Sequence, residues 1–79
     1  MDRKELEAIV IKAVATIYGK DEAELSMATN IKEELGGASV KMVGLTAAIE
    51  EETDAMVELQ VASACETLGD LVDAVEAEL

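Results

Sequence analysis

The chain has 79 residues, enough for one small hydrophobic core but not for the deep cleft of a typical enzyme. It contains no histidine and one cysteine, Cys65, so Ser-His-Asp and Cys-His catalysis, Cys-rich zinc sites and internal disulfides are all excluded from this chain alone. We therefore expect one domain over residues 1–79 that is not an enzyme and holds no metal.

The net charge is −12, from 18 acids and 6 bases, and it is unevenly distributed along the chain. Every base lies at or before Lys41, so residues 42–79 contain acids and no base. Such a surface repels nucleic acids and anionic membranes, and we expect neither as a partner. A basic protein is the natural complement, although the acids alone also serve to keep a small helical protein soluble.

Apolar runs are only a few residues long, far below the roughly 20 that span a bilayer. Met1 is followed at once by the charged stretch "DRKELE", which does not resemble a signal peptide. We expect a soluble, monomeric, cytoplasmic protein.

Residues 2–18 have the apolar spacing of an amphipathic helix. Asp2 with Glu5 is typical of a helix start, and Gly19 of a helix end. The predicted apolar stripe consists of Leu6, Ile9, Val10, Ala13, Val14 and Ile17.

Residues 19–38 mix charged and small polar residues and predict a long loop. Its spaced apolar residues are expected to pin it to the core. These are Leu25, Met27, Ile31 and Leu35.

A second helix is predicted over residues 39–52, with Met42, Leu45, Thr46 and Ile49 on the core face and Val43 at its flank. The opposite face is unusually apolar and small, which indicates close approach by a partner. Gly44 costs a helix about 1 kcal/mol relative to alanine, so either a partner approaches closely there, or the glycine packs under a neighbouring loop or reflects weak selection. The candidate docking residues are Val40, Lys41, Gly44, Ala47, Ala48 and Glu51.

Residues 53–65 predict a short helix or an irregular turn, because the alternating Val57, Leu59 and Val61 have no second strand to pair with. Thr67 and Asp70 then form a capping box for a last helix whose apolar stripe contains Leu68, Leu71, Val72 and Val75. The predicted fold is an all-α bundle of three main helices and one short helix.

Most candidates for chemistry have simpler explanations. The carboxylates of Glu50, Glu51, Glu52 and Asp54 lack the ligand order of a calcium loop, and Gly36-Gly37 does not match a phosphate-binding loop. Cys65 lies in an apolar stretch and is expected to be a buried small hydrophobe.

Ser39 has two roles open to it at the start of the second predicted helix. Its hydroxyl suits an N-cap, which contributes about 1 kcal/mol. The same position suits a covalently attached phosphoryl group, because a helix N-terminus favours negative charge. The serine alone does not decide between them.

The stretch "IKEELGGASVKMVGLTAAIEEE", together with "TLGDLVDAV", resembles the acyl carrier protein family, and the likeness covers nearly the whole chain. The resemblance implies an acyl-carrier-like bundle in which Ser39 carries 4′-phosphopantetheine, transferred from coenzyme A by a phosphopantetheinyl transferase. The attached thiol would hold acyl or related groups as thioesters for separate enzymes of fatty-acid, polyketide or specialised metabolite biosynthesis, whose basic surfaces dock on the second helix.

The sequence departs from that family at Ala38, Val40, Lys41 and Gly44, where an acid, a leucine, an acid and a glutamate are common. The first half of the docking helix has therefore lost its negative charge, which favours a specialised carrier with dedicated partners. An alternative is an unmodified carrier-like adaptor that binds a protein through the second helix and uses Ser39 only as a cap.

Overall fold

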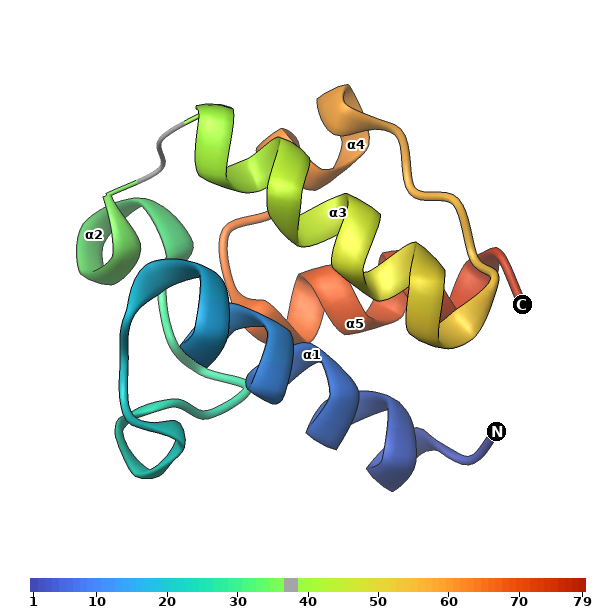
Figure 1. Ribbon diagram of the computed structural model, residues 1–79, viewed down its shortest axis with the longest axis horizontal. Coiled ribbons are helices and arrows are strands. Elements are labelled where there is room, and N and C mark those ends of the chain that lie inside the picture. Colours follow the sequence, from blue (N-terminus) through green and yellow to red (C-terminus); the bar gives the residue numbers. More distant parts are fainter. Residues whose placement is uncertain (37–38) are drawn as a thin grey trace.

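A computed structural model describes residues 1–36 and 39–79, and this part of the chain is mostly helical and contains no strand (Figure 1). The predicted all-α bundle is confirmed, with three long helices and further short ones. The elements in chain order are α1 (Arg3–Tyr18), the 3₁₀ helix η1 (Glu22–Glu24), α2 (Ile31–Leu35), α3 (Ser39–Thr53), α4 (Leu59–Ala64) and α5 (Leu68–Ala77).

Helix α1 begins and ends where the sequence predicts. The Asp2 carboxylate accepts a hydrogen bond from the Glu5 N–H at 2.8 Å, which satisfies one of the unpaired donors of the first turn. Gly19 adopts a left-handed conformation (φ 67°) that closes the helix, and its N–H donates to the Ala15 carbonyl. Tyr18, which was not part of the predicted stripe, is also buried.

Helix α1 packs against α3 and α5, and these three helices enclose the core (Figure 1). The core is aliphatic apart from Tyr18, as expected from a chain with a single aromatic residue. Its largest fully enclosed side chains are Leu6, Val10, Val14, Ile31, Leu45, Ile49, Leu68, Leu71, Val72 and Val75.

The segment predicted as a long loop contains two short helical turns. An Asp21–Glu24 capping box starts η1, and the Asn30 side chain caps α2 by accepting from the Glu33 N–H at 2.9 Å. Ile31 and Leu35 are buried, as predicted, while Leu25 and Met27 are half-buried against the core. Helix α2 was missed because it has only five residues, too few to show a helical period.

The same segment is bound to the start of α5 through its backbone. The Ile31 N–H donates to the Glu66 carbonyl at 2.8 Å, and the Leu68 N–H donates to the Thr29 carbonyl at 3.1 Å. A third bond joins the Gly69 N–H to the Met27 carbonyl at 2.9 Å. These three bonds hold the connection between α1 and α3 against the start of α5, beside the core.

The last two helices agree with the sequence. The predicted short helix is present as α4, in which Ala62 is buried and Leu59 and Val61 are exposed. Thr67 accepts from the Asp70 N–H at 3.2 Å, and the Asp70 carboxylate accepts from the Thr67 N–H, so the predicted capping box of α5 is confirmed.

Arg3 links the two ends of the chain at the surface. Its guanidinium donates to Glu7 within α1 and to Asp73 and Glu76 of α5, at 3.1, 2.7 and 3.3 Å. The start of α1 is thereby held to the C-terminal half of α5.

Candidate functional site

The candidate site lies at the start of α3, where Ser39 opens a 15-residue helix. Helix α2 ends before it at Gly36, which adopts a left-handed conformation (φ 85°) and so turns the chain away from the α2 axis. The first turn of α3 has no acidic residue, so no carboxylate of that turn opposes an anion there. The Ser39 side chain, which was predicted to cap the helix, lies outside the described part of the structure. So does Ala38, where the sequence departs from the family.

The next two side chains of α3 are exposed and differ in character. Val40 is 85% exposed, which leaves an apolar side chain in water beside the proposed attachment point. The Lys41 ammonium lies over the Tyr18 ring, 5.5 Å from its centroid, within the range of a cation–π contact. This contact joins the start of α3 to the end of α1.

The predicted docking face is divided between solvent and α1. Val40, Lys41, Ala47 and Glu51 are exposed, as expected, whereas Gly44 and Ala48 are half-buried. A Cβ built at Gly44 would lie 3.6 Å from Cδ1 of Ile17 in α1. Positions 44 and 48 are one turn apart, so they share the side of α3 that crosses α1. The expected exposed patch of Val40, Gly44, Ala47 and Ala48 is therefore wrong for Gly44 and Ala48.

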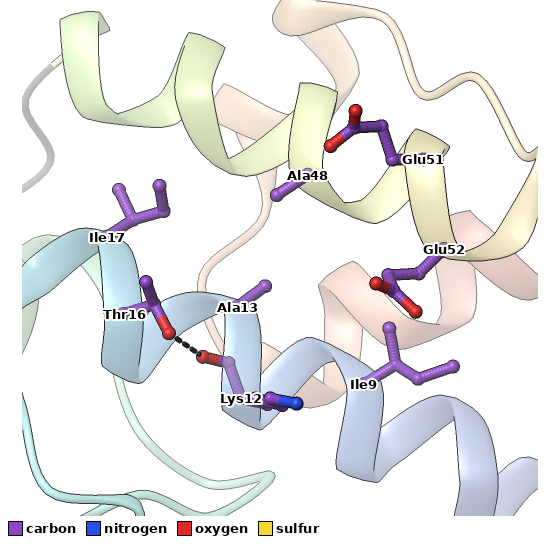
Figure 2. A pocket seen from close by; sticks show the side chains of 8 residues that line it. All are labelled: Ile9, Lys12, Ala13, Thr16, Ile17, Ala48, Glu51 and Glu52. Atoms are coloured by element: carbon purple, nitrogen blue, oxygen red, sulfur yellow. Dashed lines mark hydrogen bonds between the residues drawn. The ribbon is translucent and has the colours of Figure 1, made fainter.

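The small residues on this side of α3 leave a groove of about 170 Å³ between α1 and α3 (Figure 2). Figure 2 shows Ala13 of α1 and Ala48 of α3 pointing towards one another across it. Its lining residues are Ile9, Lys12, Ala13, Thr16, Ile17, Ala48, Glu51 and Glu52. The groove combines an apolar floor with acids from α3 and one base from α1.

Val43 was placed at the flank of the core face but is 51% exposed, while Met42, Leu45 and Ile49 are buried as predicted. Val40 and Val43 are three residues apart on a helix and so lie on neighbouring turns. They form an exposed apolar pair on the first two turns of α3. The sequence signal for the exposure of Val43 was its position at the flank of the predicted core face.

Cys65 has the environment of a structural residue. Its thiol is half-buried, with Sγ 3.4 Å from the Val61 carbonyl. Burial raises the pKa of the Cys65 thiol, and the nearby carboxylates of Asp70 and Asp73 raise it further, so the reactive thiolate is disfavoured.

The described residues contain neither a cluster of metal ligands nor a membrane-spanning helix. Within residues 1–36 and 39–79, no group of three or more His, Cys, Asp or Glu side chains is placed to hold a metal ion. No helix in that part of the chain combines the length and the apolar character needed to cross a membrane.

Comparison with known families shows to which family this helical bundle belongs. The sequence model of the phosphopantetheine attachment site family matches residues 8–75, most of the chain. The chain belongs to this family.

Two curated relatives are similar to the chain over its full length and theirs. An acyl carrier protein of Exiguobacterium sp. (strain ATCC BAA-1283 / AT1b) is 29% identical over 79 residues. An acyl carrier protein of Exiguobacterium sibiricum is 25% identical over 79 residues. The predicted resemblance to acyl carrier proteins is confirmed.

Membership of this family establishes the class of function. The chain is a phosphopantetheine-bearing carrier, not an enzyme, and its cofactor is a covalently attached 4′-phosphopantetheine. The start of α3 fits that group, because a phosphodiester is favoured at a helix N-terminus and the first turn of this helix has no acid to repel it.

Proposed function

We propose that Ser39 is the attachment residue and that the chain holds acyl or related groups as thioesters for separate enzymes. The observation that supports Ser39 is its place at the start of α3. The chain has two other serines, and neither opens a long helix. Ser26 accepts a hydrogen bond from the Ala28 N–H at 3.2 Å within a turn, and Ser63 lies inside the six-residue helix α4.

The attachment step is a phosphoryl transfer from coenzyme A. The Ser39 oxygen forms a bond to the phosphorus that bears the pantetheine, the pyrophosphate bond of coenzyme A breaks, and adenosine 3′,5′-bisphosphate leaves. The serine proton passes to a base of the transferase, since the carrier has no histidine to accept it. Once attached, the group supplies the thiol that forms a thioester with the cargo.

We further propose that the surface of α3 selects the partner enzymes, which include a phosphopantetheinyl transferase and acyl-processing or acyl-transferring enzymes. Val40 and Ala47 are exposed apolar contacts, and Glu51 is an exposed acid near the C-terminal end of the helix. Lys41 places a positive charge at the other end. The helix therefore has opposite charges at its two ends, and a uniformly basic enzyme surface complements only one of them.

This charge pattern supports a specialised carrier with dedicated partners. Fatty-acid, polyketide and other lipid or secondary metabolite pathways all use such cargo chemistry. We expect a monomer, because the high negative charge opposes self-association. We also expect the protein to act in the cytoplasm.

Intact-mass measurement tests the attachment residue. The chain is co-expressed with a broad-specificity phosphopantetheinyl transferase, and a standard carrier is treated alongside. We expect a mass gain of one 4′-phosphopantetheine in the parent chain and in the matched controls Ser26→Ala and Ser63→Ala. We expect none in Ser39→Ala, which should remain helical by circular dichroism.

A mass gain that survives Ser39→Ala would refute the assignment of Ser39. If the parent chain stays unmodified while the standard carrier gains mass, the chain is purified from its native source and its mass measured. An unmodified native chain whose Ser39→Ala variant still supports function would instead identify an adaptor that uses only the surface of α3.

A further inference from the structure

A second apolar groove, of about 410 Å³, lies between the segment around α4 and the C-terminal half of α5. One wall consists of Met56, Val57 and Val61, and the other of Ala74 and Ala77. Met56 is 64% exposed and Val61 45% exposed, so large apolar side chains face water here. Exposed apolar surface gathered in one hollow is typical of an interaction site.

This groove is separate from the candidate attachment point, because none of its lining residues belongs to α3. In Figure 1 the connection leaves the end of α3 near the C-terminus and runs back to α4, which lies beside the first half of α3. The groove also shares no lining residue with the groove between α1 and α3. It is therefore not used by the proposed attachment chemistry.

The two alanines on α5 make the hollow. Ala74 is half-buried and Ala77 exposed, and each removes all side-chain volume beyond Cβ from the wall that faces Met56 and Val61. Val57, which is only 8% exposed, forms the floor and connects the groove to the core. An aliphatic side chain from outside could occupy this space without displacing a residue of the carrier.

The rim of the groove is acidic. Glu58 and Glu78 both line it and both are exposed. Residues 42–79 contain no base, Arg3 is engaged by Glu7, Asp73 and Glu76, and the Glu58 carboxylate accepts a 3.0 Å hydrogen bond from the neutral Gln60 amide. An apolar hollow between two carboxylates complements an aliphatic side chain with lysine or arginine on either side.

We propose that this groove is a second docking surface, which binds an amphipathic, positively charged helix of a partner protein through one aliphatic side chain. A second copy of this chain does not fit, because it would bring another acidic rim against Glu58 and Glu78 in a protein of net charge −12. With one surface at α3 and another at α4 and α5, the carrier can be held by one protein while its attachment end faces another.

The test uses the unmodified chain and a short synthetic helical peptide with leucine on one face and lysine on the other. Methyl chemical shifts report which residues the peptide contacts. We expect the largest changes at Met56, Val57, Val61, Ala74 and Ala77. Peptides with glutamate in place of lysine, or with serine in place of leucine, should bind much more weakly.

Two groove variants act in opposite physical ways. Met56→Ser with Val61→Ser removes apolar wall, and Ala74→Leu fills the hollow with the carrier's own side chain. We expect each to raise the dissociation constant about tenfold, the effect of losing roughly 55 Å² of apolar contact. The matched control, Val40→Ser with Val43→Ser on α3, should leave peptide affinity unchanged.

The proposal is overturned if the lysine peptide fails to bind, shifts mainly residues of α3, or binds both groove variants as well as the parent chain. Equal binding of the glutamate peptide would also overturn it. Self-association in sedimentation experiments that Ala74→Leu abolishes would identify a second copy as the occupant. Because the chain is unmodified throughout, these outcomes do not depend on whether Ser39 carries phosphopantetheine.

Discussion

Tyr18 is the chain's only aromatic residue, and its environment is unusual for a phenol. The side chain is 8% exposed, and its hydroxyl is buried with no hydrogen-bond partner among the described residues. Most buried hydroxyls are paired, because an unpaired one loses its bonds to water without replacement. The ring, by contrast, has a clear role, since it fills the core at the end of α1 and lies under the Lys41 ammonium.

The position of Tyr18 predicts a pH dependence. Burial raises the pKa of the Tyr18 phenol above its ordinary value of about 10, because the charged form loses solvation. The folded chain therefore holds the proton more tightly than the unfolded chain. This contribution to the free energy of unfolding is complete below about pH 10 and is lost as the pH rises through the folded-state pKa.

Tyrosinate absorbance measures this directly, since no other residue contributes. We expect a titration midpoint above 10 in the folded chain and a lower one in denaturant. Tyr18→Phe should remove the part of the alkaline loss of stability that comes from this residue. Equal midpoints in folded and unfolded chains would contradict the buried position of the hydroxyl.

At the scale of single elements, α3 is both the proposed docking helix and a helix weakened by Gly44. Its glycine does not serve a left-handed turn, because the residue lies within regular helix. The nearest atom that an added Cβ would meet, Cδ1 of Ile17, is at an ordinary contact distance of 3.6 Å. An alanine is therefore tolerated by the packing between α1 and α3.

We expect Gly44→Ala to raise the free energy of unfolding by about 0.5–1 kcal/mol, because it removes backbone freedom from the unfolded chain. Ala47→Gly, at an exposed position of the same helix, should lower it by a similar amount. Urea unfolding followed by circular dichroism measures both. A loss of stability in Gly44→Ala would show that the two helices approach more closely than the structure indicates.

The elements that the sequence predicted well have signals contained in a few neighbouring residues. The Asp2 and Thr67 caps, the Gly19 stop and the stripe from Leu68 to Val75 all depend on local spacing, and all are present. Helix α2 has one turn and two apolar residues, so spacing alone did not separate it from a loop.

Tertiary contacts explain what the sequence did not predict about the site. The helical periodicity of residues 39–52 placed Gly44 and Ala48 opposite the core. It contained no information on where α1 crosses α3, and α1 packs against that side. The groove at Met56 and Ala74 depends on the C-terminal half of α5 returning beside the segment around α4, which residues so far apart in sequence did not reveal.

For the whole molecule, charge is the dominant long-range property. Eighteen acids and six bases are held within extents of 27 × 25 × 18 Å. At about 0.01 M salt the screening length is roughly 30 Å, so every acid repels every other across the fold. Arg3 is a local exception, with its bonds to Glu7, Asp73 and Glu76.

We expect the midpoint of thermal unfolding to rise when salt increases from about 0.01 M to about 0.5 M, because screening weakens this repulsion more than it weakens the exposed pairs of Arg3. Differential scanning calorimetry at constant pH measures the change. The Arg3→Gln variant should start from a lower midpoint and rise more steeply, since it has lost attractive pairs and kept the acids. A midpoint that falls with salt would show that ion pairs dominate over repulsion.

The backbone bonds that join Met27, Thr29 and Ile31 to residues 66–69 have a consequence for the order of folding. They connect two stretches that are separated in sequence by α2, α3 and α4. Closing so long a loop costs chain entropy before any bond compensates for it, so we expect these contacts to form after the helices between them have collapsed. The hydrogen bonds between the connection after α1 and the start of α5 would then complete the bundle only after α3 has packed against the core.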